Sequence, residues 1–182
     1  GLPDLWETEG IDVDNDGTVD LPLHLAPYNA DPLHRDLFVE MDYMSANAAY
    51  PSHLPLATDL ARIKAVYSSS PYASNPNGTT GIALHMDADA VRGSASNLGG
   101  GNLVPYDDGL NPVLDQFNAI KAANFNPKRA KIFYYMIWAH GYETGGGAKV
   151  SKSEGTSISL DEAVERHGAD ARGEHDEDGR PP

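Results

Sequence analysis

The sequence predicts an α/β fold in which strand, helix, strand, helix and strand follow one another in that order. Alternating residues near 36–44, two stretches with apolar residues at helical spacing, and an uncharged aromatic run near 131–139 lead to this prediction. Such an order favours parallel strands joined by right-handed crossovers. We therefore expect one sheet with both helices packed on it. A chain of 182 residues with 40% hydrophobic content is long enough for one domain with a core.

Three segments read as strands. In the first, residues 36–44, one face carries Leu37, Val39, Met41 and Tyr43, and the other carries Asp36, Phe38, Glu40 and Asp42. This alternation is typical of a half-buried strand. A similar alternation over residues 81–87 predicts the second strand. Residues 132–139 are apolar in succession, which favours a third strand near 131–139 that is buried on both faces.

The two predicted helices lie between these strands. After Pro55, apolar side chains recur at helical spacing, so we expect an amphipathic helix over about residues 55–68. Asn111 and Pro112 read as the N-cap and first residue of a second helix, which extends to about Asn124. The Gly-rich stretch between them, residues 93–111, predicts a long loop.

Polar residues follow the predicted strands. These residues are Asp42, Asp87, Asp89 and His140. Ligands of parallel sheets tend to bind beyond the carboxyl ends of the strands, which makes this edge a candidate site. Structural polar residues are the alternative reading of the same positions.

Composition narrows the possible partners. The chain has no cysteine, which excludes disulfides and thiolate zinc sites. Its formal charge of -14 is unsuited to nucleic-acid phosphates, so we expect no nucleic-acid partner. No apolar run reaches the roughly 18 residues of a membrane span, so we expect no membrane partner. Residues 1–42 hold eleven carboxylates against one basic side chain, Arg35, a crowding that favours a bound cation.

Residues 12–20 have the spacing of a calcium loop. Carboxylates stand at positions one, three, five and nine of D-V-D-N-D-G-T-V-D, as Asp12, Asp14, Asp16 and Asp20. Ca²⁺ prefers six to eight oxygen ligands, and Gly17 allows the turn that presents the Thr18 carbonyl. An EF-hand would need Glu at position twelve, where Leu23 stands. The spacing therefore predicts a calcium loop without flanking helices, and a merely solvated acidic turn is the alternative.

The start of the chain repeats part of this loop. Residues 1–4 share the form G-x-x-D with residues 17–20. Asp4 would then be the last ligand of an earlier calcium loop. Because the chain begins at Gly1 rather than Met, we expect that loop to start upstream. We divide the chain into a calcium-binding Asp-rich segment (1–35), an α/β subdomain (36–145) and an acidic tail of low order (146–182).

Several segments together resemble one known family. They are Gly1-Leu-Pro-Asp-Leu-Trp-Glu-Thr, the D-x-D-x-D-G loop, Asp31-Pro32 with His34-Arg-Asp36, Asn75-Pro-Asn-Gly-Thr-Thr-Gly-Ile82 with Leu84-His-Met-Asp87, and residues 130–140. Over residues 1–145 the chain is similar to secreted bacterial zinc metallopeptidases with thrombospondin-type-3-like calcium repeats. The resemblance implies a zincin-like fold, secretion to the extracellular space, calcium for stability and peptide-bond hydrolysis.

The chain departs from that family at the catalytic motif. No H-E-x-x-H occurs in it, so neither a zinc ligand nor a catalytic base is carried over. We expect a piece of a peptidase that is inactive alone, with Zn²⁺ and a peptide substrate only in a full-length relative. A non-catalytic, calcium-dependent extracellular structural or adhesion module is the alternative. The segment 36–140 distinguishes the two, because a bare spacer would not need it.

A second, shorter resemblance lies near the end of the chain. Lys149-Val-Ser-Lys-Ser153-Glu-Gly155, within residues 149–172, resembles the KMSKS loop region of class I aminoacyl-tRNA synthetases. That loop steadies ATP phosphates. The phosphate-binding elements that should accompany it are missing from the sequence, and a loop without its fold has no function of its own. We therefore expect no nucleotide binding, and at most a short helical turn near residues 161–166.

Overall fold

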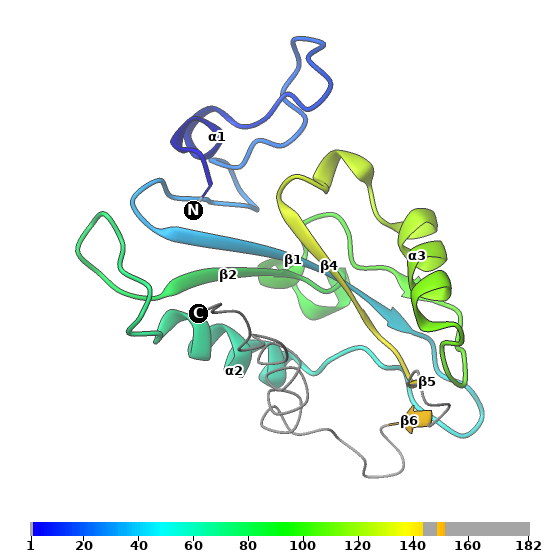
Figure 1. Cartoon of the computed structure of the whole chain (residues 1–182). Coiled ribbons are helices and arrows are strands. Elements are labelled where there is room, and N and C mark those ends of the chain that lie inside the picture. The colour runs from blue at the N-terminus through cyan, green and yellow to red at the C-terminus, as the bar shows by residue number, and fades with distance from the viewer. Residues whose placement is uncertain (1, 144–148, 152–182) are drawn as a thin grey trace, which may run out of the picture.

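The computed structural model describes residues 2–143 and 149–151 (Figure 1). The predicted α/β class is confirmed as a parallel-strand sheet with three α-helices in the described part of the chain. In order, the elements are α1 (Asp4–Glu9), β1 (Arg35–Met44), α2 (Ala57–Ser68), β2 (Ile82–Asp87), η1 (Ala90–Arg92), η2 (Ser94–Ser96), β3 (Leu103–Val104), α3 (Val113–Asn124), η3 (Pro127–Arg129), β4 (Phe133–Trp138), β5 (Gly141–Glu143) and β6 (Lys149–Ser151).

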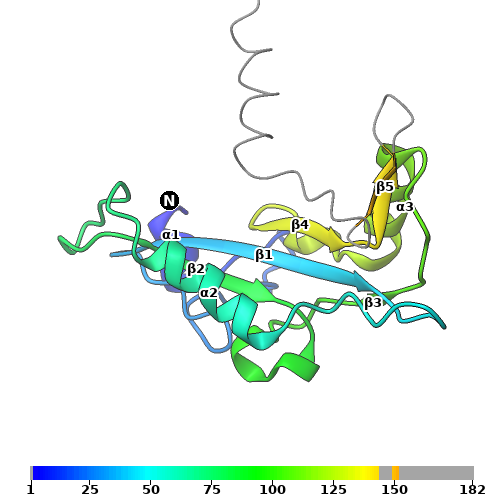
Figure 2. The same ribbon diagram turned by 90° about the horizontal axis from the view of Figure 1, so that it is seen from below.

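β1 is the central strand of the sheet. It pairs in parallel with β2 over residues 35–40 and with β4 over residues 38–43, as predicted. The short strand β3 pairs with Tyr43 and Met44. Because Tyr43 also pairs with Trp138 of β4, β3 must lie on the same side of β1 as β2. β5 lies outside this sheet and beside α3 (Figure 2), and its Tyr142 bridges to Leu110.

The two faces of the sheet are covered by different parts of the chain. On one face, α2 lies along β2 and buries Leu60 against Met41 and Met86 (Figure 1). On the other face, α3 packs beside Met44 and Val104 through Val113 and Ile120. Both predicted helices therefore pack on the sheet, as expected.

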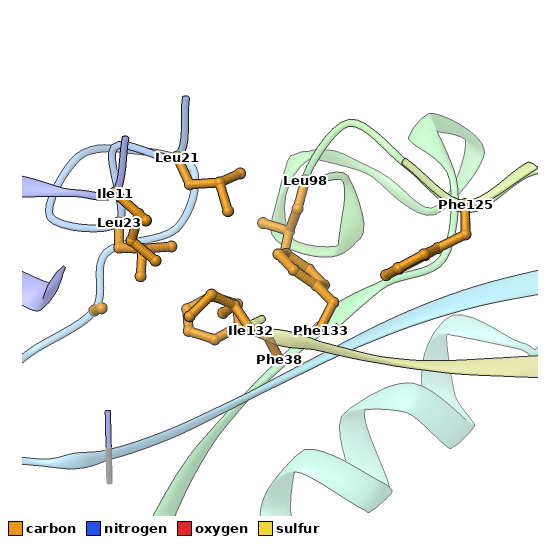
Figure 3. Close-up of a cluster of buried hydrophobic side chains, with 9 residues drawn as sticks. Ile11, Leu21, Leu23, Phe38, Leu98, Phe125, Ile132 and Phe133 are labelled. Carbon is orange, nitrogen blue, oxygen red and sulfur yellow. The ribbon is translucent and has the colours of Figure 1, made fainter. Parts of the chain in front are cut away.

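The Asp-rich segment shares its core with the sheet. Side chains from both sides of the boundary drawn at residue 35 form one buried cluster: Ile11, Leu21, Leu23, Ala30, Phe38, Leu98, Phe125, Ile132 and Phe133 (Figure 3). Leu23 and Phe38 have no exposed surface in it. The loop at residues 12–20 is thus held against the sheet by the apolar residues on either side of it.

Two predictions of strand burial were wrong. The polar face of β1 is buried rather than solvated, because the Asp-rich segment and the loop before β3 cover it, and Glu40 and Asp42 lie inside. β4 was expected to be buried on both faces, yet Tyr134 is 68% and Met136 39% exposed. α2 lies along β2, on the far side of β1, and leaves this part of β4 open.

The element boundaries also differ from the prediction in detail. α2 begins at Ala57, so Pro55 precedes the helix rather than standing in its first turn. Pro112, not Asn111, is the N-cap of α3, and its extended backbone delays the helix to Val113. The predicted loop 93–111 contains η2 and β3, and β3 pairs with Tyr43 and Met44 at the end of β1.

The end of the chain is described only in part. Of the predicted tail, residues 149–151 form β6, which pairs antiparallel with β5. The rest of the tail, including the predicted turn near 161–166 and most of the segment that resembles the synthetase loop, lies outside the described residues. None of the described helices is both long and apolar enough to span a bilayer.

Candidate functional site

The Asp-rich loop is closed by an antiparallel bridge between Ile11 and Leu21. Within it, Asn15 (φ 60°) and Gly17 (φ 91°) adopt the left-handed region, which these two residue types tolerate best. The Asp12 carboxylate accepts hydrogen bonds from the backbone N–H groups of Asp16 (3.2 Å) and Gly17 (2.8 Å). The tight turn predicted from the position of Gly17 therefore fixes Asp12 in place.

Three of the predicted calcium ligands come together. Carboxylate oxygens of Asp12, Asp14 and Asp20 lie within 4.8 Å of one another, close enough to share one ion. The Asp20 side chain is also fixed by the backbone, because its Oδ2 accepts a hydrogen bond from the N–H of Val13 at 2.9 Å. No other set of three or more metal-ligating carboxylates or imidazoles gathers in this way in the described part of the chain.

The carboxylates of the other two predicted aspartate ligands, Asp4 and Asp16, stand apart from this Asp trio (Asp12, Asp14 and Asp20). Asp16 turns one carboxylate oxygen to the N–H of Thr18, at 2.8 Å, and so shapes the turn. Thr18 itself is exposed. Asp4 lies in the first turn of α1. The structure thus gathers Asp12, Asp14 and Asp20 and leaves the carboxylates of Asp4 and Asp16 outside the group.

A cation from elsewhere in the chain contacts the Asp trio. The ammonium Nζ of Lys128, in η3, lies 2.7 Å from Asp14 Oδ2 and 2.5 Å from Asp20 Oδ1. The hydrogen bond from Lys128 holds the pKa of Asp20 below its ordinary value. In return, Asp14 and then Asp20 raise the pKa of Lys128. Asp20 therefore stays charged at neutral pH and can attract a positive ion.

Arg129, the last residue of η3, is the centre of a buried cluster of charged side chains. The Arg129 guanidinium lies 2.5 Å from Glu40 Oε2 and 2.7 Å from Asp87 Oδ2, and it stacks 3.7 Å from the Phe133 ring centroid. Asp87 also accepts the N–H groups of Leu98 and Gly100. A side-chain carbon on Gly100 would lie 2.1 Å from Arg129 Nη1, so only glycine fits there. This cluster ties η3 and the loop at residues 98–100 to β1 and β2.

The other acidic residues at the strand ends also have structural partners. Asp42 accepts hydrogen bonds from the Asn102 N–H (2.7 Å) and the Tyr135 hydroxyl (2.6 Å). Asp89 accepts from the Tyr43 hydroxyl at 2.7 Å and caps η1. The structural alternative therefore applies to Asp42, Asp87 and Asp89, whose carboxylates bind groups of the chain itself.

The ion cluster makes stability depend on pH. Burial raises the pKa of Glu40 from 4.5 to about 7; Asp87 adds to the rise and Arg129 opposes it. The folded state thus holds this proton more tightly than the unfolded chain does. We expect Glu40 to contribute stability at pH 5 that is lost as the pH rises through about 7.

Urea unfolding of wild type and Glu40→Gln at pH 5 and pH 8 tests this expectation. From pH 5 to pH 8 the free energy of unfolding should fall more in wild type than in Glu40→Gln, because the amide of the variant does not ionise. Glu9→Gln is the matched control, since Glu9 is exposed in the same acidic half of the chain. An unchanged difference between wild type and Glu40→Gln at both pH values would contradict the shift.

The carboxyl edge of the sheet also holds a histidine pair. Nε2 of His53, in the segment after β1, lies 3.3 Å from Nδ1 of His140, which follows β4. Both residues line a cavity of about 420 Å³ together with Tyr50, Leu56, Asp59 and Trp138. The sequence analysis considered His140 only as a polar strand end. Nothing local pairs it with His53, since the two are 87 positions apart.

Comparisons of this chain with protein-family models, with curated proteins and with solved structures find no match.

Proposed function

We propose that this chain is the calcium-binding N-terminal portion of a secreted zinc metallopeptidase and that it has no peptidase activity alone. The observation that carries the calcium part is the convergence of Asp12, Asp14 and Asp20 on one point. Three carboxylates so close together repel one another unless a cation joins them. Lys128, a cation from another segment, contacts Asp14 and Asp20, and Ca²⁺ would take the place of its ammonium beside them.

The donor set favours calcium over other ions. Carboxylate oxygens are hard ligands, and a loop of this kind adapts to the six to eight oxygens that Ca²⁺ takes at 2.3–2.6 Å. Mg²⁺ demands a stricter octahedron, and zinc sites of proteins mostly contain imidazole or thiolate. Backbone carbonyls and water would complete the shell around Asp12, Asp14 and Asp20. The role of the ion is to hold a loop that borders the shared core at Ile11 and Leu21.

Calcium should therefore stabilise the folded chain. An ion that binds only the folded state adds about 2.7 kcal/mol at a hundredfold excess over its dissociation constant. We expect the thermal midpoint to rise with added Ca²⁺ and to fall again with EDTA. Asp14→Asn should abolish most of the rise, because it removes one carboxylate of the trio. Asp115→Asn, at an exposed position of α3, should keep it. A thermal midpoint that changes with neither Ca²⁺ nor EDTA would refute the calcium proposal.

The metallopeptidase part of the proposal depends on the family resemblance over residues 1–145. Its support in the structure is coarse: a parallel sheet with helices on both faces, and an apolar stretch of β4 that nothing described covers. Tyr134 and Met136 are exposed on it. A further helix carrying H-E-x-x-H would find room to pack at that face. Secretion and a peptide substrate belong to the same proposal.

The chain alone should not hydrolyse peptide bonds. An activated water needs zinc held by convergent ligands, and the sequence contains no H-E-x-x-H. We expect no cleavage of casein above a mock preparation when Zn²⁺ and Ca²⁺ are supplied. Casein cleavage that a zinc chelator stops would overturn this part of the proposal.

A chimera tests the same point constructively. Joining the final strand and H-E-x-x-H helix of a metallopeptidase of the resembled family after Gly145 should create a zinc site and restore casein cleavage. The matched control carries Gln in place of the motif's Glu, which keeps the zinc ligands but removes the base. A folded chimera that binds no zinc would favour the alternative, a non-catalytic structural or adhesion module.

A further inference from the structure

We propose that His53 and His140 form a second metal site, which binds a divalent transition-metal ion such as Zn²⁺ through two imidazole nitrogens. This site lies at the carboxyl ends of β1 and β4, at the opposite end of β1 from the Asp trio's segment (Figure 1). It is independent of the calcium proposal, because it uses different residues and a different kind of ligand atom.

The backbone of His53 and the ring of His140 are held in place before any ion arrives. The N–H of His53 donates to the carbonyl of Met44 at 2.9 Å, which fixes its backbone to the end of β1. The ring of His140 is packed between aromatic rings, with the centroids of Tyr50 and Tyr106 at 4.2 and 5.3 Å. His140 is only 4% exposed. Little side-chain entropy would therefore be lost when the pair binds an ion.

The spacing of the two nitrogens suits one shared ion. Nitrogens bound to a tetrahedral Zn²⁺ at about 2.0–2.1 Å lie about 3.3–3.4 Å from each other. Nε2 of His53 and Nδ1 of His140 are 3.3 Å apart. An N–H hydrogen bond is usually shorter, at about 2.9–3.0 Å. A bound ion would lie off the line that joins the two nitrogens, because that line is too short to hold two bonds of about 2.0–2.1 Å, and both rings would turn toward the ion.

The other nitrogen of His140 faces a carboxylate. Asp108 Oδ1 lies 4.0 Å from Nε2 of His140, and the Tyr106 hydroxyl donates to the same carboxylate oxygen at 3.3 Å. Metal-bound histidines usually turn their second nitrogen to such a group, which fixes the tautomer and strengthens the ligand. At 4.0 Å, beyond the reach of a hydrogen bond, and with a side chain that is 74% exposed, Asp108 acts on His140 through its negative charge.

The cavity leaves the remaining coordination positions accessible. The histidine pair forms part of its wall, so water or a small ligand can complete the shell around an ion held by two imidazoles. Zinc sites that keep an open position are those that act on ligands rather than only supporting a fold. The formal charge of -14 also draws cations to the chain. Imidazole favours Zn²⁺ and Cu²⁺, whereas the Asp trio favours Ca²⁺.

Zn²⁺ titration calorimetry of the full chain tests the proposal, at pH 7.5 with excess Ca²⁺ to occupy the Asp trio. We expect one site whose affinity falls at least tenfold in His53→Gln and stays unchanged in His24→Gln, an exposed histidine. Binding should also be lost at pH 5, because the imidazoles must be neutral to bind the ion. Asp108→Asn should weaken binding tenfold or more without removing it.

A second readout identifies the ligand atoms directly. With Cu²⁺ as the probe, electron paramagnetic resonance should show splitting from two nitrogens in wild type and in His24→Gln, but fewer in His53→Gln. His53 is partly exposed, so this variant should fold, and an unchanged thermal midpoint without metal would verify that. The proposal is overturned if wild type takes up no Zn²⁺, or if Zn²⁺ affinity and the nitrogen splitting are the same in His53→Gln.

Discussion

Replacing Arg129 with Met should lower the free energy of unfolding by about 3–5 kcal/mol, the usual cost of breaking a buried ion pair by removing one partner. Arg129 faces two buried carboxylates, Glu40 at 2.5 Å and Asp87 at 2.7 Å. Without the guanidinium, both would remain out of water with no counter-charge. They could relieve this cost only by taking up protons, so the loss should be larger at pH 8 than at pH 5.

The measurement is urea unfolding at both pH values, with Arg62→Met as the matched control. Arg62 pairs with Asp59 at 3.9 Å, but its side chain is 84% exposed. Exposed pairs of this kind contribute about 0–1 kcal/mol, because water and salt screen them. If Arg129→Met unfolded within 1 kcal/mol of wild type, Arg129 could not be the anchor that its burial and distances indicate.

Leu23→Ala should cost about 2–5 kcal/mol, and the whole domain should still unfold in one transition. Leu23 has no exposed surface and belongs to the cluster that contains Phe38 and Phe133 of the sheet. Its truncation removes packing atoms and leaves a cavity between the Asp-rich segment and the sheet. Because that core is shared, the two parts should lose stability together.

Leu25→Ala is the matched control, two residues further along the chain. Leu25 is 52% exposed, so the same truncation there should stay within about 0.5 kcal/mol. Tryptophan fluorescence suits the test, because Trp6 lies in α1 and Trp138 ends β4. If Leu23→Ala shifted only the transition reported by Trp6, the segment 1–35 would be an independent unit.

The sequence by itself was enough to predict the order of β1, α2, β2, α3 and β4, but not α1 or the short strands β3, β5 and β6. Local patterns were sufficient for these elements: the alternation over 36–44 and 81–87 predicted strands, and the helical spacing after Pro55 predicted a helix. The structure has β1, β2 and α2 at these places. The turn at Gly17 was also predictable, because a tight turn restricts which residue types fit. Periodicity could not decide what covers each strand face. For that reason the burial of Glu40 and the exposure of Tyr134 were both missed.

The tertiary structure alone decided which distant polar groups meet. Lys128 reaches Asp20 from 108 positions away, and His53 meets His140 across 87. These contacts follow from the parallel register of β1 with β4, which sets what lies at each end of the sheet. A short local pattern records that a segment is a strand, but not its neighbour or its register. The spacing of Asp12, Asp14 and Asp20 could therefore be read from the sequence, whereas the cation beside them and the histidine pair could not.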